Sequence, residues 1–301
     1  MHIPSSMMEG AVCPVTAALA TAGIAAAVVA ALRSEEKPSP ARFAAVSAMI
    51  FAGQMLNFPV QDGTSGHLMG GVLAALLLGT PFGVLAMTLV VVVQAVLFAD
   101  GGLNVLGANV LNMAVIGAGL AGSLAVALRS RFAGWQRMAG TAATAWLSVV
   151  LASLACSIEL AASGAVALSQ VVPAMLGTHA LIGLGEAAMT VALLALVAER
   201  ERSAYDFRAI LLPFGLALFA AVVLSQFASS FPDGLEWVAT ELSFLTDSAG
   251  ATFAPLADYR MPGVSDNAAS TGLAGLAGVV AIALAAAFSS RLWHRPAVAA
   301  R

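Results

Sequence analysis

The first residues of the chain combine donor groups that can chelate a metal ion. The chain begins Met1-His2-Ile3, so a free α-amine, the amide nitrogen of His2 and its imidazole Nδ1 lie in one short segment. The amine and amide close a five-membered ring with a metal ion, and the amide and imidazole close a six-membered ring. Planar nitrogen donors of this kind favour Ni²⁺ or Cu²⁺, with Co²⁺ as a further candidate. The alternative interpretation is that His2 is simply the second residue of a frayed tail.

A second histidine supplies the donor that this chelate lacks. His67 stands in the segment GTSGHLMGG (residues 63–71), at the outer start of a short apolar stretch. The chain has only four histidines, and the topology predicted below places His2 and His67 at the same membrane face. The imidazole of His67 would complete a planar set of four nitrogens. The alternative is an interfacial histidine that caps the following helix.

Several amide side chains stand within or beside apolar stretches, where burial costs free energy unless each finds a partner. The candidates for orienting the metal ligands are Gln54, Asn57, Asn109 and Asn112. Gln54 and Asn57 are nearest to His67 in sequence, and Asn109 and Asn112 share a helix face. For most amides in these apolar stretches we favour the alternative, ordinary hydrogen bonds between helices worth about 1 kcal/mol or less each, with Gln54 and Asn57 as the best candidates for orienting His67.

One apolar stretch carries two ionisable residues, His179 and Glu186, which are seven positions apart and share a helix face. An ionisable residue inside a membrane helix indicates a functional site by default. We expect Glu186 to act as a relay or partner-sensing group, or else to pair with a neighbouring helix.

The composition places these residues in a membrane protein. Of the 301 residues, 60% are hydrophobic and 10% are charged, and the mean hydropathy is +0.93. Soluble domains carry about a quarter charged residues, so an ordinary soluble enzyme is excluded. With one lysine and a net charge of −3, the chain lacks a basic face for nucleic acid. It contains neither a P-loop motif nor a CxxC pair.

Apolar stretches predict an all-α fold, a polytopic membrane helix bundle of about nine transmembrane segments. They cover residues 11–32, 41–58, 67–79, 81–99, 104–128, 138–160, 169–198, 209–229 and 271–293. The third is too short to cross a bilayer fully and indicates a half-helix or a re-entrant segment. If this third stretch is counted as a full crossing, the arginine clusters obey the positive-inside rule. The N-terminus is then outside and the C-terminus inside.

The chain divides into two parts at the charged stretch Glu199–Arg202. Residues 1–205 form a predicted seven-helix core that carries the candidate metal ligands. Residues 206–301 form a predicted two-helix segment whose helices are joined by an acidic outside loop at about 230–270. No positive charge precedes the first apolar stretch, so we expect a retained helix rather than a cleaved signal peptide, with Met1 kept outside.

The motifs, in their order along the chain, resemble a known family. MHIPSSMMEGAVCPVT, NFPVQDGTSGHLMGG, QAVLFADGGLNVLGANVLNM and HALIGLGEA are similar to the substrate-specificity membrane component of cobalt/nickel energy-coupling-factor transporters, the CbiM/NikM type. SFPDGLEWV and APLADYRMPG resemble its small PDGLE-type partner (NikN/CbiN-like), here fused at residues 206–301. The resemblance covers nearly the whole chain.

The resemblance implies a metal-capturing subunit of an ATP-driven importer for Ni²⁺ or Co²⁺ in the bacterial cytoplasmic membrane, and not an enzyme. It implies that the amine of Met1, the amide and imidazole of His2 and the imidazole of His67 hold the transported ion. It also implies a separate coupling subunit (CbiQ/NikQ-like) and ATPase subunits (CbiO/NikO-like), so this chain binds no ATP. Ser5-Ser6 stand where the family often has Asp-Gly, which does not touch the ligands.

Two other classes of function compete with this prediction. A self-contained secondary divalent-metal transporter or channel would need an ionisable path through the membrane, for which His179 and Glu186 are the candidates. A regulatory or assembly protein would use residues 206–301 to dock partners and would not depend on His2 or His67 for metal accumulation.

Overall fold

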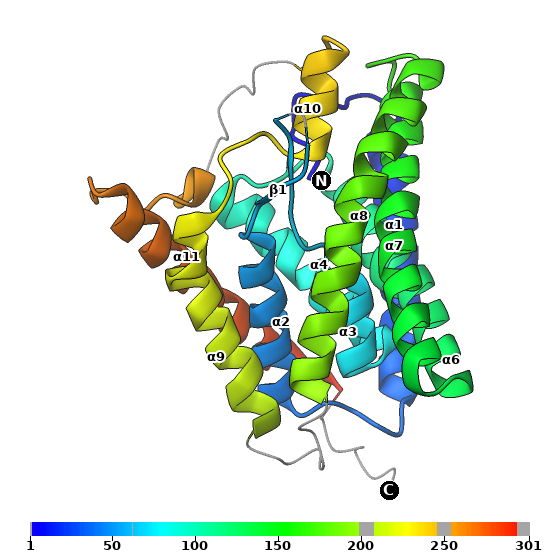
Figure 1. The fold of residues 1–301 in the computed structure, drawn as a ribbon, viewed down its shortest axis with the longest axis vertical. Helices are drawn as coiled ribbons and strands as arrows, with labels where there is room; N and C mark the ends of the chain where they lie inside the picture. Colours follow the sequence, from blue (N-terminus) through cyan, green and yellow to red (C-terminus); the bar gives the residue numbers. More distant parts are fainter. Residues whose placement is uncertain (1, 62, 199–207, 246–253, 294–301) are drawn as a thin grey trace, which may run out of the picture.

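A computed structural model describes residues 2–61, 63–198, 208–245 and 254–293; the predicted ligand Met1 lies outside the described residues. The chain is a helical, multi-pass membrane protein (Figure 1). Within the described residues, 6 helices are long and apolar enough to cross a membrane. They span Val12–Arg33, Thr80–Phe98, Leu106–Arg131, Gly134–Ala162, Leu168–Val197 and Asn267–Leu292. The start of the chain and α10 (Gly234–Glu241) lie at one end of the bundle, and the α1–α2 connection lies at the other.

Three apolar helices are shorter than a crossing requires. They are α2 (Pro40–Gln54), α3 (Gly71–Leu78) and α9 (Arg208–Val222). With 8 residues, α3 rises only about 12 Å, less than half of the ~30 Å hydrocarbon core. The third predicted stretch is therefore a short helix, and the predicted count of nine segments is not confirmed. Residues 67–70 are irregular and precede α3, which lengthens the connection that carries His67.

Close packing of small residues encloses α3 inside the bundle. Seven of its eight residues are buried, and a Cβ at Gly71 would lie 2.8 Å from the backbone of residues 117–118. A turn at Gly79, which has φ +87°, leads into α4 (Thr80–Val93) and was predicted by the Gly79-Thr80-Pro81 sequence. A helix that is apolar on all sides must be covered on all sides, as α3 is.

The remaining core helices contain two π-helical stretches that the hydropathy pattern does not reveal. The first helix is α1 (Val12–Arg33), and α4 ends in η1 (Gln94–Phe98). The fifth predicted stretch is a continuous run of α5 (Leu106–Val110), η2 (Leu111–Ala121) and α6 (Gly122–Arg131). Two long helices follow, α7 (Gly134–Ala162) and α8 (Leu168–Ala198). π-Helical turns often occur at functional sites, and η1 ends two residues before Asp100.

A small hairpin interrupts the otherwise helical fold. β1 (Phe58–Pro59) pairs antiparallel with β2 (Ser65–Gly66), directly before His67. The predicted helix 41–58 therefore ends at Gln54, because the chain leaves the helix to form this hairpin.

The C-terminal segment packs on one side of the core and over its end. α9 and α11 (Asn267–Ser289) both contact α2. Between them lie η3 (Leu224–Phe227), α10 and η4 (Ala257–Tyr259), and η5 (Ser290–Leu292) follows α11. The predicted helix 209–229 ends at Val222, and the predicted loop contains α10. That helix begins with a capping box of Asp233 and Glu236, which the Pro-Asp-Gly-Leu-Glu sequence supplies.

Candidate metal site

The start of the chain is held against the core by its own backbone. The N–H of Ile3 donates to Oδ1 of Asn109 (2.8 Å), and Nδ2 of Asn109 donates to the carbonyl of Ile3 (3.1 Å). The N–H of Gly102 donates to the same carbonyl (2.9 Å), and Ile3 is fully buried. Asn109 thus orients the segment that carries His2, as one of the two sequence interpretations expected. This anchoring shows that the segment is not a frayed tail at His2 and Ile3.

Two adjacent glycines leave room for this segment. A Cβ at Gly102 would lie 2.4 Å from the backbone nitrogen of Ser5, so no larger residue fits there without displacing the N-terminal backbone. Gly101 has φ +93°, a conformation that other L-residues rarely adopt. The Asp-Gly-Gly sequence therefore lets the chain start pass within contact distance of the core.

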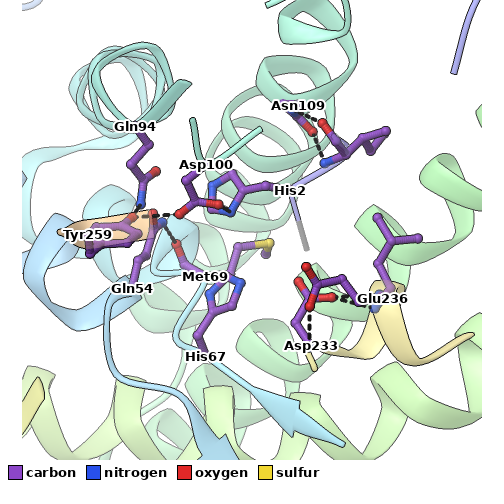
Figure 2. A network of polar contacts seen from close by, with 12 residues as sticks. His2, Gln54, His67, Met69, Gln94, Asp100, Asn109, Asp233, Glu236 and Tyr259 are labelled. Carbon is purple, nitrogen blue, oxygen red and sulfur yellow. Dashed lines mark hydrogen bonds and ion pairs between the residues drawn. The ribbon is translucent and has the colours of Figure 1, made fainter. Parts of the chain in front are cut away.

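The two predicted imidazole ligands lie side by side (Figure 2). The rings of His2 and His67 are stacked, with centroids 5.6 Å apart and an interplanar angle of 13°. His2 is only 8% exposed. Burial lowers the pKa of His67 to about 3, so its ring is neutral near pH 7, which metal binding requires. Nδ1 of His67 lies 2.9 Å from the carbonyl oxygen of Leu68, a contact that fixes the ring when Nδ1 carries the proton.

A carboxylate that sequence analysis did not single out contacts His2. Oδ1 of Asp100 lies 3.0 Å from Nδ1 of His2. Burial alone would raise the pKa of Asp100, but His2 and a hydrogen bond from Tyr259 hold it well below its usual range. The nitrogen predicted to join the chelate, Nδ1, thus faces Asp100, whereas Nε2 of His2 is buried without a hydrogen-bonding partner.

The C-terminal segment reaches this carboxylate through Tyr259. Its hydroxyl donates to Oδ2 of Asp100 (2.6 Å) and accepts from Nε2 of Gln94 (3.2 Å). Burial raises the pKa of Tyr259 well above its ordinary value, and Asp100 raises it further, so the hydroxyl keeps the proton that it donates. Asp100 and Tyr259 both stand inside motifs quoted above, but neither lies near His2 in sequence, so no spacing signal marks them.

The connection that follows His67 is fixed by two buried side chains. Glu186 accepts hydrogen bonds from the N–H groups of Met69 (2.5 Å) and Gly70 (3.0 Å), and Nε2 of Gln54 donates to the carbonyl of Met69 (2.7 Å). Glu186 is fully buried, and Gln54 is nearly so. Gln54 therefore contacts the backbone two residues after His67. Glu186 contacts the backbone beside a predicted ligand rather than an ionisable partner.

Three other residues predicted for the site make different contacts. Asn112 donates to Oε2 of Glu159 (2.7 Å), and this pair makes no contact with either histidine ring. His179 is buried, with Nδ1 2.9 Å from the carbonyl oxygen of Met175, and it packs against Gly234 of α10. Asn57 lines the cavity described next, and its carbonyl accepts from the N–H of Ser229 (2.8 Å). These contacts link His179 to α8 and α10, and Asn112 to α7.

The C-terminal segment closes over the hairpin before His67. The N–H of Ser65 donates to the carbonyl of Pro232 (2.8 Å), and its hydroxyl donates to the carbonyl of Phe231 (2.8 Å). Between the core and this segment lies a cavity of about 420 Å³. Its lining includes His2, Gln54, Asn57 and His67, together with four carboxylate residues, Asp100, Asp233, Glu236 and Asp258. Three of these four belong to the C-terminal segment.

Side chains alone do not form a conventional metal cluster here. Within the described ranges, no group of three or more His, Cys, Asp and Glu residues is close enough to hold a metal ion.

The described residues form a polytopic helical bundle with two stacked histidine rings near the start of the chain. Residues 2–204 match CbiM, described as the cobalt uptake substrate-specific transmembrane region, and residues 208–295 match the PDGLE domain. The chain belongs to the CbiM family, with a PDGLE domain fused at its C-terminus.

Proteins similar to this chain are named as nickel or transition metal transport proteins. A putative fused nickel transport protein NikMN of Archaeoglobus fulgidus is 33% identical and aligns over 99% of this chain and 100% of its own length. The fused nickel transport protein NikMN of Rhodobacter capsulatus is 35% identical over 65% of this chain and 61% of its own. The crystal structure of a truncated transition metal transporter superposes with a TM-score of 0.59 at 28% identity, covering 67% of this chain and all of that one.

Proposed function

We propose that this protein is the metal-capturing subunit of an ATP-driven, energy-coupling-factor-type importer for Ni²⁺ or Co²⁺. The observation that carries the proposal is the parallel stacking of His2 and His67, 5.6 Å apart, at the anchored start of the chain. Two imidazoles together with an N-terminal amine are a nitrogen-rich donor set. Relatives named as nickel and cobalt transport proteins support the choice of cargo.

The proposed ligands are the amine of Met1, the amide and Nδ1 of His2, and the imidazole of His67. Nδ1 of His2 is held by Asp100, so binding exchanges this hydrogen bond for a bond to the metal. Nitrogen donors in a plane disfavour Mg²⁺, Ca²⁺ and Mn²⁺, which prefer oxygen ligands and higher coordination numbers.

The same proposal assigns a role to each part of the chain and to its partner subunits. Residues 1–205 act as the metal-specificity core, and residues 206–301 act as a cover over the site. A coupling subunit and ATPase subunits of the CbiQ/NikQ and CbiO/NikO types supply the energy, since this sequence has no P-loop motif. The protein resides in the bacterial cytoplasmic membrane with its N-terminus outside and its C-terminus inside, as the arginine clusters predict.

The test is the metal content of the purified protein, offered Ni²⁺ and Co²⁺ together and measured by mass spectrometry. One form keeps its native start, and a second carries one added glycine before Met1, which moves the amine away from the His2 amide. We expect about one ion per chain in the native form and near zero in the second. A matched control inserts the glycine after Glu36, in the exposed connection between α1 and α2 at the other end of the bundle, and should bind normally. Equal metal content in the native and N-terminally extended forms would show that the amine is not a ligand.

A further inference from the structure

A second polar cavity lies at the end of the bundle opposite the histidines, where α6 meets α7 (Figure 1). It encloses about 360 Å³. Arg129 near the end of α6 and Arg137 in the first turns of α7 both line it, and α8 closes its third side. The metal site and the cover over it are not part of this cavity.

Among the described residues, the two arginines have no counter-charge. No carboxylate in this part of the chain lines the cavity, and neither guanidinium forms an ion pair there. Nε of Arg137 donates to the carbonyl of Phe132 (3.0 Å), which leaves its terminal NH₂ groups for other acceptors. Arg129 is half-buried. Two like charges that share a partly enclosed cavity repel each other, and a bound anion would remove this cost.

The surroundings identify the kind of anion. Guanidinium groups pair with phosphate oxygens through parallel hydrogen bonds. The rest of the cavity is mostly apolar, with Met138, Val191, Leu194 and Ala195 beside the arginines, which suits an ester and acyl chain better than a free hydrated ion.

The position of the cavity points to the membrane. It lies at the short corner between two long apolar helices, which must coincide with a membrane surface whichever way the protein is oriented. Trp135 at this corner is 75% exposed, as is typical of aromatic residues at the bilayer–water interface. Basic pockets between membrane helices bind anionic headgroups. We propose that Arg129 and Arg137 bind the phosphate of an anionic phospholipid such as phosphatidylglycerol.

The experiment measures lipid binding to the full chain, exchanged from detergent into nanodiscs or examined by native mass spectrometry. The test variant is Arg129→Gln with Arg137→Gln. The control is Arg131→Gln, which removes an exposed charge from the same corner outside the cavity. We expect phosphatidylglycerol affinity to fall about 10-fold or more in the double variant and to change less than about 2-fold in the control.

Three outcomes would overturn the assignment. They are unchanged phosphatidylglycerol binding in the double variant, equal binding of zwitterionic phosphatidylcholine by the unmodified protein, and displacement of the lipid by inorganic phosphate at equal concentration, which would indicate a free-phosphate site. Nickel content and the thermal unfolding midpoint are measured on every variant. Both should stay unchanged, so a failure of this proposal is distinguishable from a failure of the metal site or of folding.

Discussion

The core and the C-terminal segment contribute to the candidate site in different ways. The core supplies both histidines and the buried groups that fix the backbone around them, notably Asn109, Gln54 and Glu186. Among its described residues, the C-terminal segment supplies no histidine to the site. It contributes a hydroxyl, backbone carbonyls that bind the hairpin, and most of the carboxylates of the cavity.

Because the two regions contribute differently to the site, substitutions in them should affect metal binding differently. Changes in the core should alter how tightly the ion is held, because they move donor atoms. Changes in the C-terminal segment should alter access and fine orientation, because Tyr259 reaches His2 through Asp100 and the carboxylates of this segment line the cavity. A solved transporter that matches 67% of this chain over its whole length is consistent with a core that folds without such a segment.

The largest effect is expected from Glu186. Its carboxylate accepts two consecutive N–H groups beside His67, and removing it leaves both buried donors unpaired. We expect Glu186→Ala to lower nickel affinity about 100-fold and Glu186→Gln about 10-fold, the range found for groups that orient ligands. Equilibrium dialysis against a nickel buffer measures both values.

Glu159→Gln is the matched control for this change. Glu159 is also a buried glutamate in a long core helix, but it pairs with Asn112 rather than with the His67 connection. It should leave nickel affinity within about 3-fold of the native value. If both glutamate variants lost affinity equally, general destabilisation of the bundle would explain the result and the anchoring role would be rejected.

A smaller effect is expected where the two regions meet, at Asp100 and Tyr259. Replacing Asp100 with Asn removes a negative charge beside a dication site and should weaken nickel binding about 10-fold. Tyr259→Phe keeps the ring stacked on Phe98 and removes only the hydroxyl that holds Asp100, so we expect a loss of about 3-fold.

The double variant decides whether the hydroxyl acts through Asp100. In a double-mutant cycle the Tyr259→Phe effect should disappear once Asp100 is Asn, because the group it orients is gone. Full additivity of the two losses would mean that Tyr259 acts on the site by another route, and the C-terminal segment would then have no specific link to His2.

Sequence patterns were sufficient for the fold class and for the two imidazole ligand candidates. Hydropathy located the long helices to within a few residues, since bilayer length leaves few alternatives. His2 and His67 were identified from donor chemistry and from the scarcity of histidine. The hairpin at residues 58–66 was missed, because two-residue strands carry no periodicity. The π-helical turns were missed for a similar reason, since their side chains remain apolar.

The groups around the ligands were harder to predict than the ligands. Asp100 and Tyr259 are 159 positions apart, and only the packing of the C-terminal segment on the core brings them together. Glu186 was recognised as unusual, yet its partners are backbone N–H groups, which no side-chain pattern reveals. Asn112 was grouped with Asn109 by helical spacing, but it turns to Glu159. A shared helix face does not specify which neighbour a side chain meets.

The smallest expected effect concerns the cavity carboxylates, and it separates access from affinity most clearly. The substitutions are Glu236→Gln and Asp258→Asn. Glu236→Gln keeps the capping box of α10, because Gln serves at this position as Glu does. Asp258 has φ +53°, a conformation that Asn tolerates. Both substitutions remove negative charge from the lining of the cavity without changing a proposed metal ligand. We expect the nickel association rate to fall about 2- to 5-fold at low ionic strength, with an unchanged dissociation rate, and the difference to vanish in high salt.

Glu241→Gln is the control, since Glu241 lies on the same helix but does not line the cavity. A changed dissociation rate in stopped-flow measurements would place these carboxylates on the bound ion itself, and the distinction drawn between core and cover would not hold.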